Sequence, residues 1–140
     1  HRSYASMTAC GLGSVVLLDG LMGKDWRADP VASAGVNWLA RYFTVMENFG
    51  PVEDLMVKEM ESDAVNPMTE FYFCLWALER AGWITGLRTF GTRDWHAEGS
   101  SEILTAQRSD GSWYGGAKRC QPVWDTCFAI LFLTRSTRSE

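Results

Sequence analysis

Two segments of this 140-residue chain are apolar on almost every side of the helix that their spacing predicts. Residues 71–78 read FYFCLWAL and residues 127–133 read CFAILFL. A helix that is apolar all round is expected to be buried all round. Such helices need neighbours on several sides, so the chain is expected to be all-α, with an inner layer of apolar helices covered by an outer layer.

Helix-start signals divide the chain further. Asp29-Pro30 and Asn66-Pro67 each place a capping side chain before a proline at the first helical position. Ser6 is the expected N-cap of the first helix, and Glu70 is expected in the first turn of the third. The predicted helices cover residues 6–21, 30–43, 67–82, 94–107 and 122–135, and the polar stretch 47–66 has room for a short extra helix over 52–60.

The five predicted helices form a repeat. The third and fifth align through Pro67 with Pro122, Phe73 with Phe128 and Leu78 with Leu133, and the second and fourth through Asp29 with Asp94 and Ala32 with Ala97. The odd-numbered helices are the apolar type and the even-numbered ones are amphipathic. This order predicts one repeat domain over residues 1–140, with two and a half copies of an inner–outer helix pair that bury their apolar faces by stacking.

Composition excludes several classes of protein. Hydrophobic residues make up 46% of the chain and charged residues 21%, which is a globular balance. The net charge of −4 argues against a nucleic-acid partner, and no apolar run is long enough for a membrane span. Four cysteines without a CxxC pair favour a reducing, cytoplasmic location, with three of them packed as small hydrophobes. A start at His1 without a leader or initiator Met suggests the C-terminal part of a longer chain.

A motif follows the fourth helix, where residues 107–113 read QRSDGSW. Asp110-Gly111 favours a tight turn, Gln107 is expected to bond the open end of the next helix, and Trp113 to stack over the glutamine. The string resembles the QW motif of the terpenoid cyclase and protein prenyltransferase superfamily (squalene cyclase-like), and the whole chain is similar to uncharacterised bacterial prenyltransferase/squalene-oxidase-repeat proteins. The resemblance implies a partial α/α toroid of alternating inner and outer helices.

The cyclases of that superfamily place a proton-donating Asp in a D-x-D-D-T-A motif at the start of an inner helix. Residues 123–127 of this chain read VWDTC, so Asp125 and Thr126 match while Trp124 stands at the donor position. An indole cannot act as a general acid. Asp125 is therefore the one candidate catalytic residue that the resemblance leaves.

The prenyltransferase β subunits bind zinc through a D-x-C pair at an inner-helix start, preceded by an Arg-Cys pair. Asp125, Cys127, Arg119 and Cys120 match that pattern, whereas Pro122 replaces a diphosphate-binding Lys and the later His ligand has no counterpart. The resemblance thus implies a zinc site at Asp125 and Cys127. The alternative is that Asp125 caps the fifth helix and Cys127 packs in the core.

Aromatic side chains on the inner helices suggest a cavity for an isoprenoid or another apolar small molecule. The expected substrate-binding residues are Tyr72, Trp76, Trp124, Phe128 and Phe132, with Arg119 near a diphosphate. Packing between helical layers is the alternative role for each ring. Five helices cannot close a ring, so the rest of its own chain or a second copy is expected to cover the inner helices.

Three functions remain open at this point. The first is an isoprenoid-binding domain that resembles the cyclases or prenyltransferases. The second is a non-catalytic helical repeat scaffold for protein interaction. The third is a fragment of a zinc-dependent prenyltransferase β-like subunit.

Overall fold

The computed structural model describes residues 4–45, 70–116 and 120–135, and this part of the chain is all-helical. An isolated antiparallel bridge pairs Phe90 with Arg93, and the described residues contain no strand. The all-α prediction is therefore confirmed, while the expected extra helix over 52–60 lies outside the described residues. The elements are α1 (Ala5–Leu21), the short 3-10 helix η1 (Trp26–Ala28), α2 (Pro30–Tyr42), α3 (Phe71–Thr85), α4 (Trp95–Thr105) and α5 (Pro122–Arg135).

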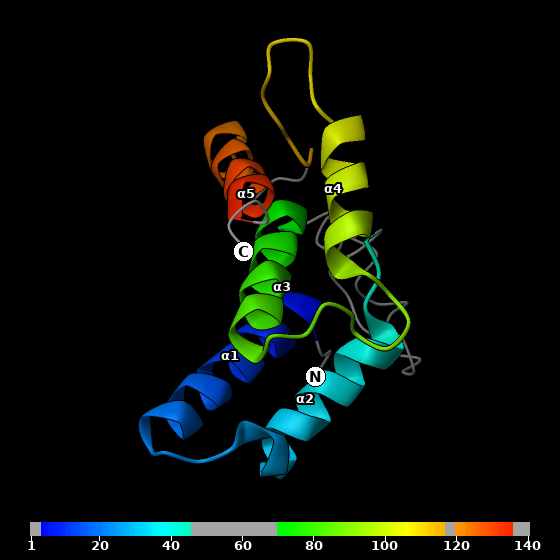
Figure 1. Ribbon diagram of the computed structural model, residues 1–140. Helices are drawn as coiled ribbons and strands as arrows, with labels where there is room; N and C mark the ends of the chain where they lie inside the picture. Colours follow the sequence, from blue (N-terminus) through cyan, green and yellow to red (C-terminus); the bar gives the residue numbers. More distant parts are fainter. Residues whose placement is uncertain (1–3, 46–69, 117–119, 136–140) are drawn as a thin grey trace, which may run out of the picture.

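The helices pack in the order that the repeat predicts. α3 lies between α1 and α5, while α2 packs on α1 and α4 packs on α3 and α5 (Figure 1). The apolar helices α1, α3 and α5 thus form one continuous stack, and the amphipathic helices lie to one side of it. Fully buried side chains from both sets, among them Leu39, Leu75, Leu78, Ile103 and Phe132, make up the core between them.

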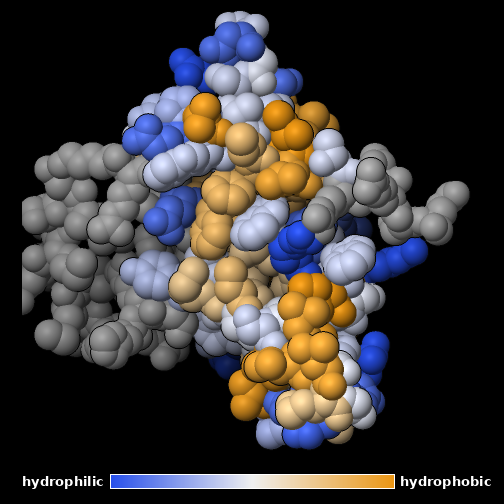
Figure 2. Space-filling view, turned by 90° about the vertical axis from the view of Figure 1, so that its left-hand side faces the viewer, coloured by the Kyte–Doolittle hydropathy of each residue, from blue (hydrophilic) through white to orange (hydrophobic). Residues whose placement is uncertain are grey.

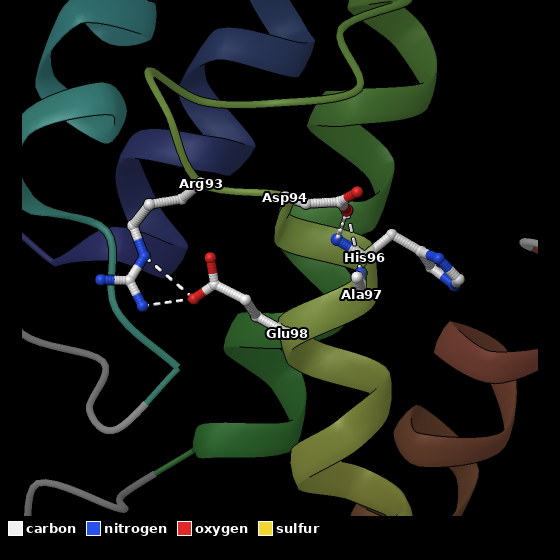
Figure 3. Close-up of polar contacts among 5 residues, drawn as sticks. All are labelled: Arg93, Asp94, His96, Ala97 and Glu98. Atoms are coloured by element: carbon white, nitrogen blue, oxygen red, sulfur yellow. Dashed lines mark hydrogen bonds and ion pairs between the residues drawn. The ribbon is translucent and has the colours of Figure 1, made fainter.

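The two outer helices begin with the same device. Asp29 Oδ1 accepts the backbone N–H groups of Val31 and Ala32 at 2.7 and 3.0 Å. Asp94 Oδ1 does the same for the second and third residues of α4, at 3.1 and 2.9 Å (Figure 3). Each such cap stabilises its helix by about 1 kcal/mol. The alignment of these two aspartates in the sequence therefore corresponds to a shared structural role.

The ends of α1 and α3 differ from the prediction. Tyr4 is the N-cap of α1, and Ser6 is buried inside the helix. Glu70 precedes α3 in the left-handed conformation, with φ of 59°, so it is not in the first helical turn. α3 continues past Gly82 to Thr85 because the left-handed residue that ends it is Gly86, with φ of 71°.

Burial of the inner helices on every side is also wrong for the described residues. Leu21 is 86% exposed, Trp83 65% and Val123 69%. Figure 2 shows the side of the molecule that lies on the left in Figure 1. On this face, hydrophobic side chains gather near the top, at the height of α5, and near the bottom, at the height of α1. Within the described residues, α1 packs against α2 and α3, and α5 packs against α3 and α4, which leaves apolar side chains on both α1 and α5 exposed. Among the described helices, none has the length and apolar character to cross a membrane.

Candidate functional site

A hollow of about 220 Å³ lies where α3 and α5 begin. Both helices contribute aromatic side chains to it, and two carboxylates and a thiol complete its lining. The lining residues are Glu70, Phe73, Cys120, Trp124, Asp125 and Phe128. The lining of the hollow is therefore partly apolar, through its aromatic rings, and partly acidic, through its two carboxylates.

Three rings form an aromatic cluster between the two helices, and two of them, Phe73 and Phe128, line the hollow. Phe73 lies 5.8 Å from Trp76 and 5.5 Å from Phe128, and Trp76 lies 5.4 Å from Phe128, between ring centroids. These tilted and edge-on arrangements are the favourable geometries for aromatic pairs. The guanidinium of Arg80 lies over the Trp76 ring at 5.7 Å, so the cluster has a cation at its edge.

Asp125 is buried within the first turns of α5, with 4% of its surface exposed. Its Oδ2 accepts the backbone N–H of Gly115 at 2.9 Å. Burial raises the pKa of this carboxyl, and the hydrogen bond from Gly115 acts in the opposite direction. The described contact of Asp125 therefore tethers the preceding loop, whereas capping of its own helix was the alternative expected from the sequence.

Tyr72 is 2% exposed and does not line the hollow, but it interacts electrostatically with two residues that do, Asp125 and Cys120. Its pKa is raised to about 12, first by burial and then by the negative charges of Asp125 and Cys120. The phenol is thus protonated at neutral pH and close to the acidic side of the hollow. Because so little of Tyr72 reaches the surface, it is part of the core.

The QRSDGSW segment joins α4 to α5 by contacts that differ from the predicted ones. Gln107 Nε2 donates to the carbonyl of Gly111 at 3.1 Å, inside its own turn. The Trp113 indole N–H donates to the carbonyl of Ile103 at 2.6 Å, and its backbone N–H donates to Thr126 Oγ1 at 3.1 Å. The tight turn at Asp110-Gly111 is confirmed, with Gly111 at φ of 83°. The link to the next helix therefore passes through Trp113 and Thr126.

The structure brings part of the predicted site together. Trp124, Asp125 and Phe128 line the hollow, and Trp76 adjoins it through the aromatic cluster. Phe132 lies elsewhere, fully buried against α4, where it stacks on His96 at 5.6 Å. Arg119 lies outside the described residues.

Three lining residues were not predicted from the sequence: Glu70, Phe73 and Cys120. The repeat alignment already paired Phe73 with Phe128, so this signal was available for the aromatic wall. Glu70 was assigned to a helical turn instead. Its position at the hollow follows from the left-handed backbone just before α3.

The predicted zinc ligands are not brought together by the described structure. Asp125 is buried, while Cys127, two residues along the same helix, is exposed. Residues two apart on a helix do not face each other. In the described part of the chain, no three His, Cys, Asp or Glu side chains are grouped so that they could hold a metal ion. Cys127 is also not the buried hydrophobe that was expected, because it is exposed.

Comparison of this chain with protein families, with curated proteins and with solved structures finds no match.

Proposed function

We propose that this chain is a helical repeat domain of α/α-toroid type that binds an isoprenoid or similar apolar chain in the hollow between α3 and α5. The observation that carries the proposal is the cluster of Phe73, Trp76 and Phe128, whose rings contact one another beside a hollow. Stacked inner helices with the amphipathic helices to one side support the toroid-like arrangement. Conjugated aromatic faces solvate apolar chains well.

The size of the hollow limits what it holds. Enclosed ligand pockets are usually about 300–1,000 Å³, and this hollow measures about 220 Å³. It therefore fits one end of an apolar chain. The remainder would lie along the exposed apolar surface of the inner helices, where Trp124 and Leu131 on α5 are partly open to solvent.

The charges around the hollow favour a neutral ligand. Glu70 and Asp125 both line it, and two carboxylates repel a diphosphate. Arg80 is near the outer edge of the aromatic cluster, where it contacts Trp76. We therefore expect an isoprenoid alcohol or hydrocarbon to bind better than the corresponding diphosphate. Catalysis is no part of this proposal.

The test is isothermal titration of the folded protein with geraniol, farnesol and farnesyl diphosphate. Trp124→Ala removes an exposed ring from the hollow, and Trp83→Ala is its matched control, because Trp83 is a comparably exposed tryptophan that does not line it. One aromatic contact contributes about 0.5–1.5 kcal/mol, so Trp124→Ala should weaken farnesol binding about two- to tenfold. Trp83→Ala should leave it unchanged. An absence of saturable binding, or equal losses in both variants, refutes the proposal.

A repeat scaffold for protein interaction is the second candidate. The exposed leucines of α1, Leu17, Leu18 and Leu21, favour it, because surfaces of this kind commonly contact another protein. The rest of a longer chain or a second copy would be the partner. Self-association in sedimentation velocity that Leu18→Ser with Leu21→Ser abolishes, without farnesol binding, would favour the scaffold. The zinc-dependent alternative has no comparable support from the described residues.

A further inference from the structure

A second hollow, of about 340 Å³, lies at the opposite end of the inner stack, where α1 ends and α2 begins. Three of its six lining residues are aspartates. The lining consists of Asp19, Lys24, Asp25, Ala28, Asp29 and Pro30. This hollow shares no residue with the aromatic site. Its lining has a net negative charge, so it is a different kind of site.

Asp19 is the feature of this hollow that its helical environment does not explain. The side chain is 3% exposed, and its Oδ2 is buried without a hydrogen-bond partner in the described part of the chain. Burying a carboxylate without a partner is strongly unfavourable. Asp19 also lies in the last turn of α1, where the carbonyl groups make the helix end electronegative. A positively charged group bound against the side of Asp19 that lines the hollow would balance the carboxylate charge and complement the helix end.

The other two aspartates use one oxygen each in local structure. Asp25 Oδ1 accepts the N–H of Arg27 at 3.1 Å and pairs with its guanidinium at 3.7 Å. Asp29 Oδ1 accepts the two N–H groups that cap α2. All these contacts fall on Oδ1 of each residue. None of these contacts uses the Oδ2 atom of Asp25 or Asp29, and both residues line the hollow with Asp19.

We propose that this hollow binds a linear polyamine, with one ammonium group on Asp19 and a second on Asp25 or Asp29. The volume is far larger than one ion needs, and no three acidic side chains of the described residues are grouped to hold a metal. An alkylammonium group donates three hydrogen bonds and tolerates acceptors that are spread apart. Lys24 is the cation of this chain that competes for the same acceptors.

Spermidine is the probe, titrated calorimetrically into the wild-type protein at low salt. The key variant is Asp19→Asn, which keeps the shape of the side chain and removes the buried charge. Glu102→Gln removes the same charge from α4, outside this hollow, and controls for net charge. We expect saturable binding by the wild type, a loss of at least tenfold in Asp19→Asn, and no loss in Glu102→Gln. Lys24→Gln should strengthen binding by removing the competitor.

Melting temperatures keep the test independent of folding defects. Without spermidine, Asp19→Asn should melt above the wild type, because it no longer buries an unpartnered charge. Spermidine should then raise the melting temperature of the wild type and not of the variant. Absence of saturable binding, equal losses in both charge variants, or calcium binding that excludes spermidine each overturns the proposal. The proposal is also overturned if Lys24→Gln both binds spermidine more weakly than the wild type and melts at a lower temperature.

Discussion

The packing of α4 on α5 depends on the absence of a side chain at Gly99. A Cβ built there would lie 2.6 Å from Cζ of Phe132 and 3.2 and 3.3 Å from its two Cε atoms. Phe132 has no room to move away, because it is fully buried and lies against Trp95 and His96. Alanine gains about 1 kcal/mol of helix propensity over glycine, whereas overpacking a core costs about 1–3 kcal/mol. The clash therefore decides the sign, and Gly99→Ala should be destabilising.

We expect Gly99→Ala to lower the free energy of unfolding by up to about 2 kcal/mol and the melting temperature by up to about 6 °C. Gly11→Ala is the matched control, because Gly11 is also helical but has nothing within 4 Å of the added Cβ. It should raise the stability by up to about 1 kcal/mol. Denaturant unfolding followed by circular dichroism measures both. If Gly99→Ala stabilises the protein as Gly11→Ala does, then Phe132 is not packed against α4 as described.

Three further predictions concern titration, reactivity and the loop between α4 and α5. Because folding raises the pKa of Tyr72 to about 12, protonated Tyr72 contributes to stability fully below pH 10, and this contribution is lost as the pH rises through about 12. Tyr72→Phe should remove this loss of stability at alkaline pH, together with the tyrosinate absorbance that titrates with it. A thiol-specific disulfide reagent should label exposed Cys127 rapidly in the native protein, while buried Cys74, whose pKa burial raises, should react only on unfolding; equal rates would contradict the burial described. Trp113→Phe removes the hydrogen bond to the buried Ile103 carbonyl and should lower the unfolding free energy by about 1–3 kcal/mol, as denaturant titration would measure; an unchanged midpoint would mean that this bond contributes nothing.

The fold class and the helix order were predictable because they depend on local signals. An aspartate directly before the first helical residue favours N-capping, and both Asp29 and Asp94 are N-caps. The ends of α3 were not predictable from such signals. Gly82 and Gly86 are equally good helix terminators in the sequence, and only tertiary packing distinguishes them. Trp95 lies directly over Gly82 and keeps it in the helix, which leaves Gly86 to end it.

The candidate site was predictable in its residue types and less so in its arrangement. Apolar spacing places aromatic residues on inner helices, but it does not distinguish a ring that lines a hollow from one that fills the core. Phe128 and Phe132 are one helical turn apart on α5, yet the first faces α3 and the second faces α4. The role of Asp125 was similarly open, since its partner, the Gly115 N–H, lies ten residues away in a loop.

The stacking order explains why both hollows lie at the ends of helices. In a stack of α1, α3 and α5, the sides of the helices that face one another are filled by side chains of their neighbours. At the helix ends the chain turns away, so backbone polar groups and short loops must share the space with side chains. Carboxylates serve that purpose at both ends, through Asp125 on Gly115 and through Asp25 and Asp29 on their own turns. Among the described residues, the Asp19 carboxylate accepts no such backbone hydrogen bond, and this difference is the reason that we propose a ligand as the partner of its charge.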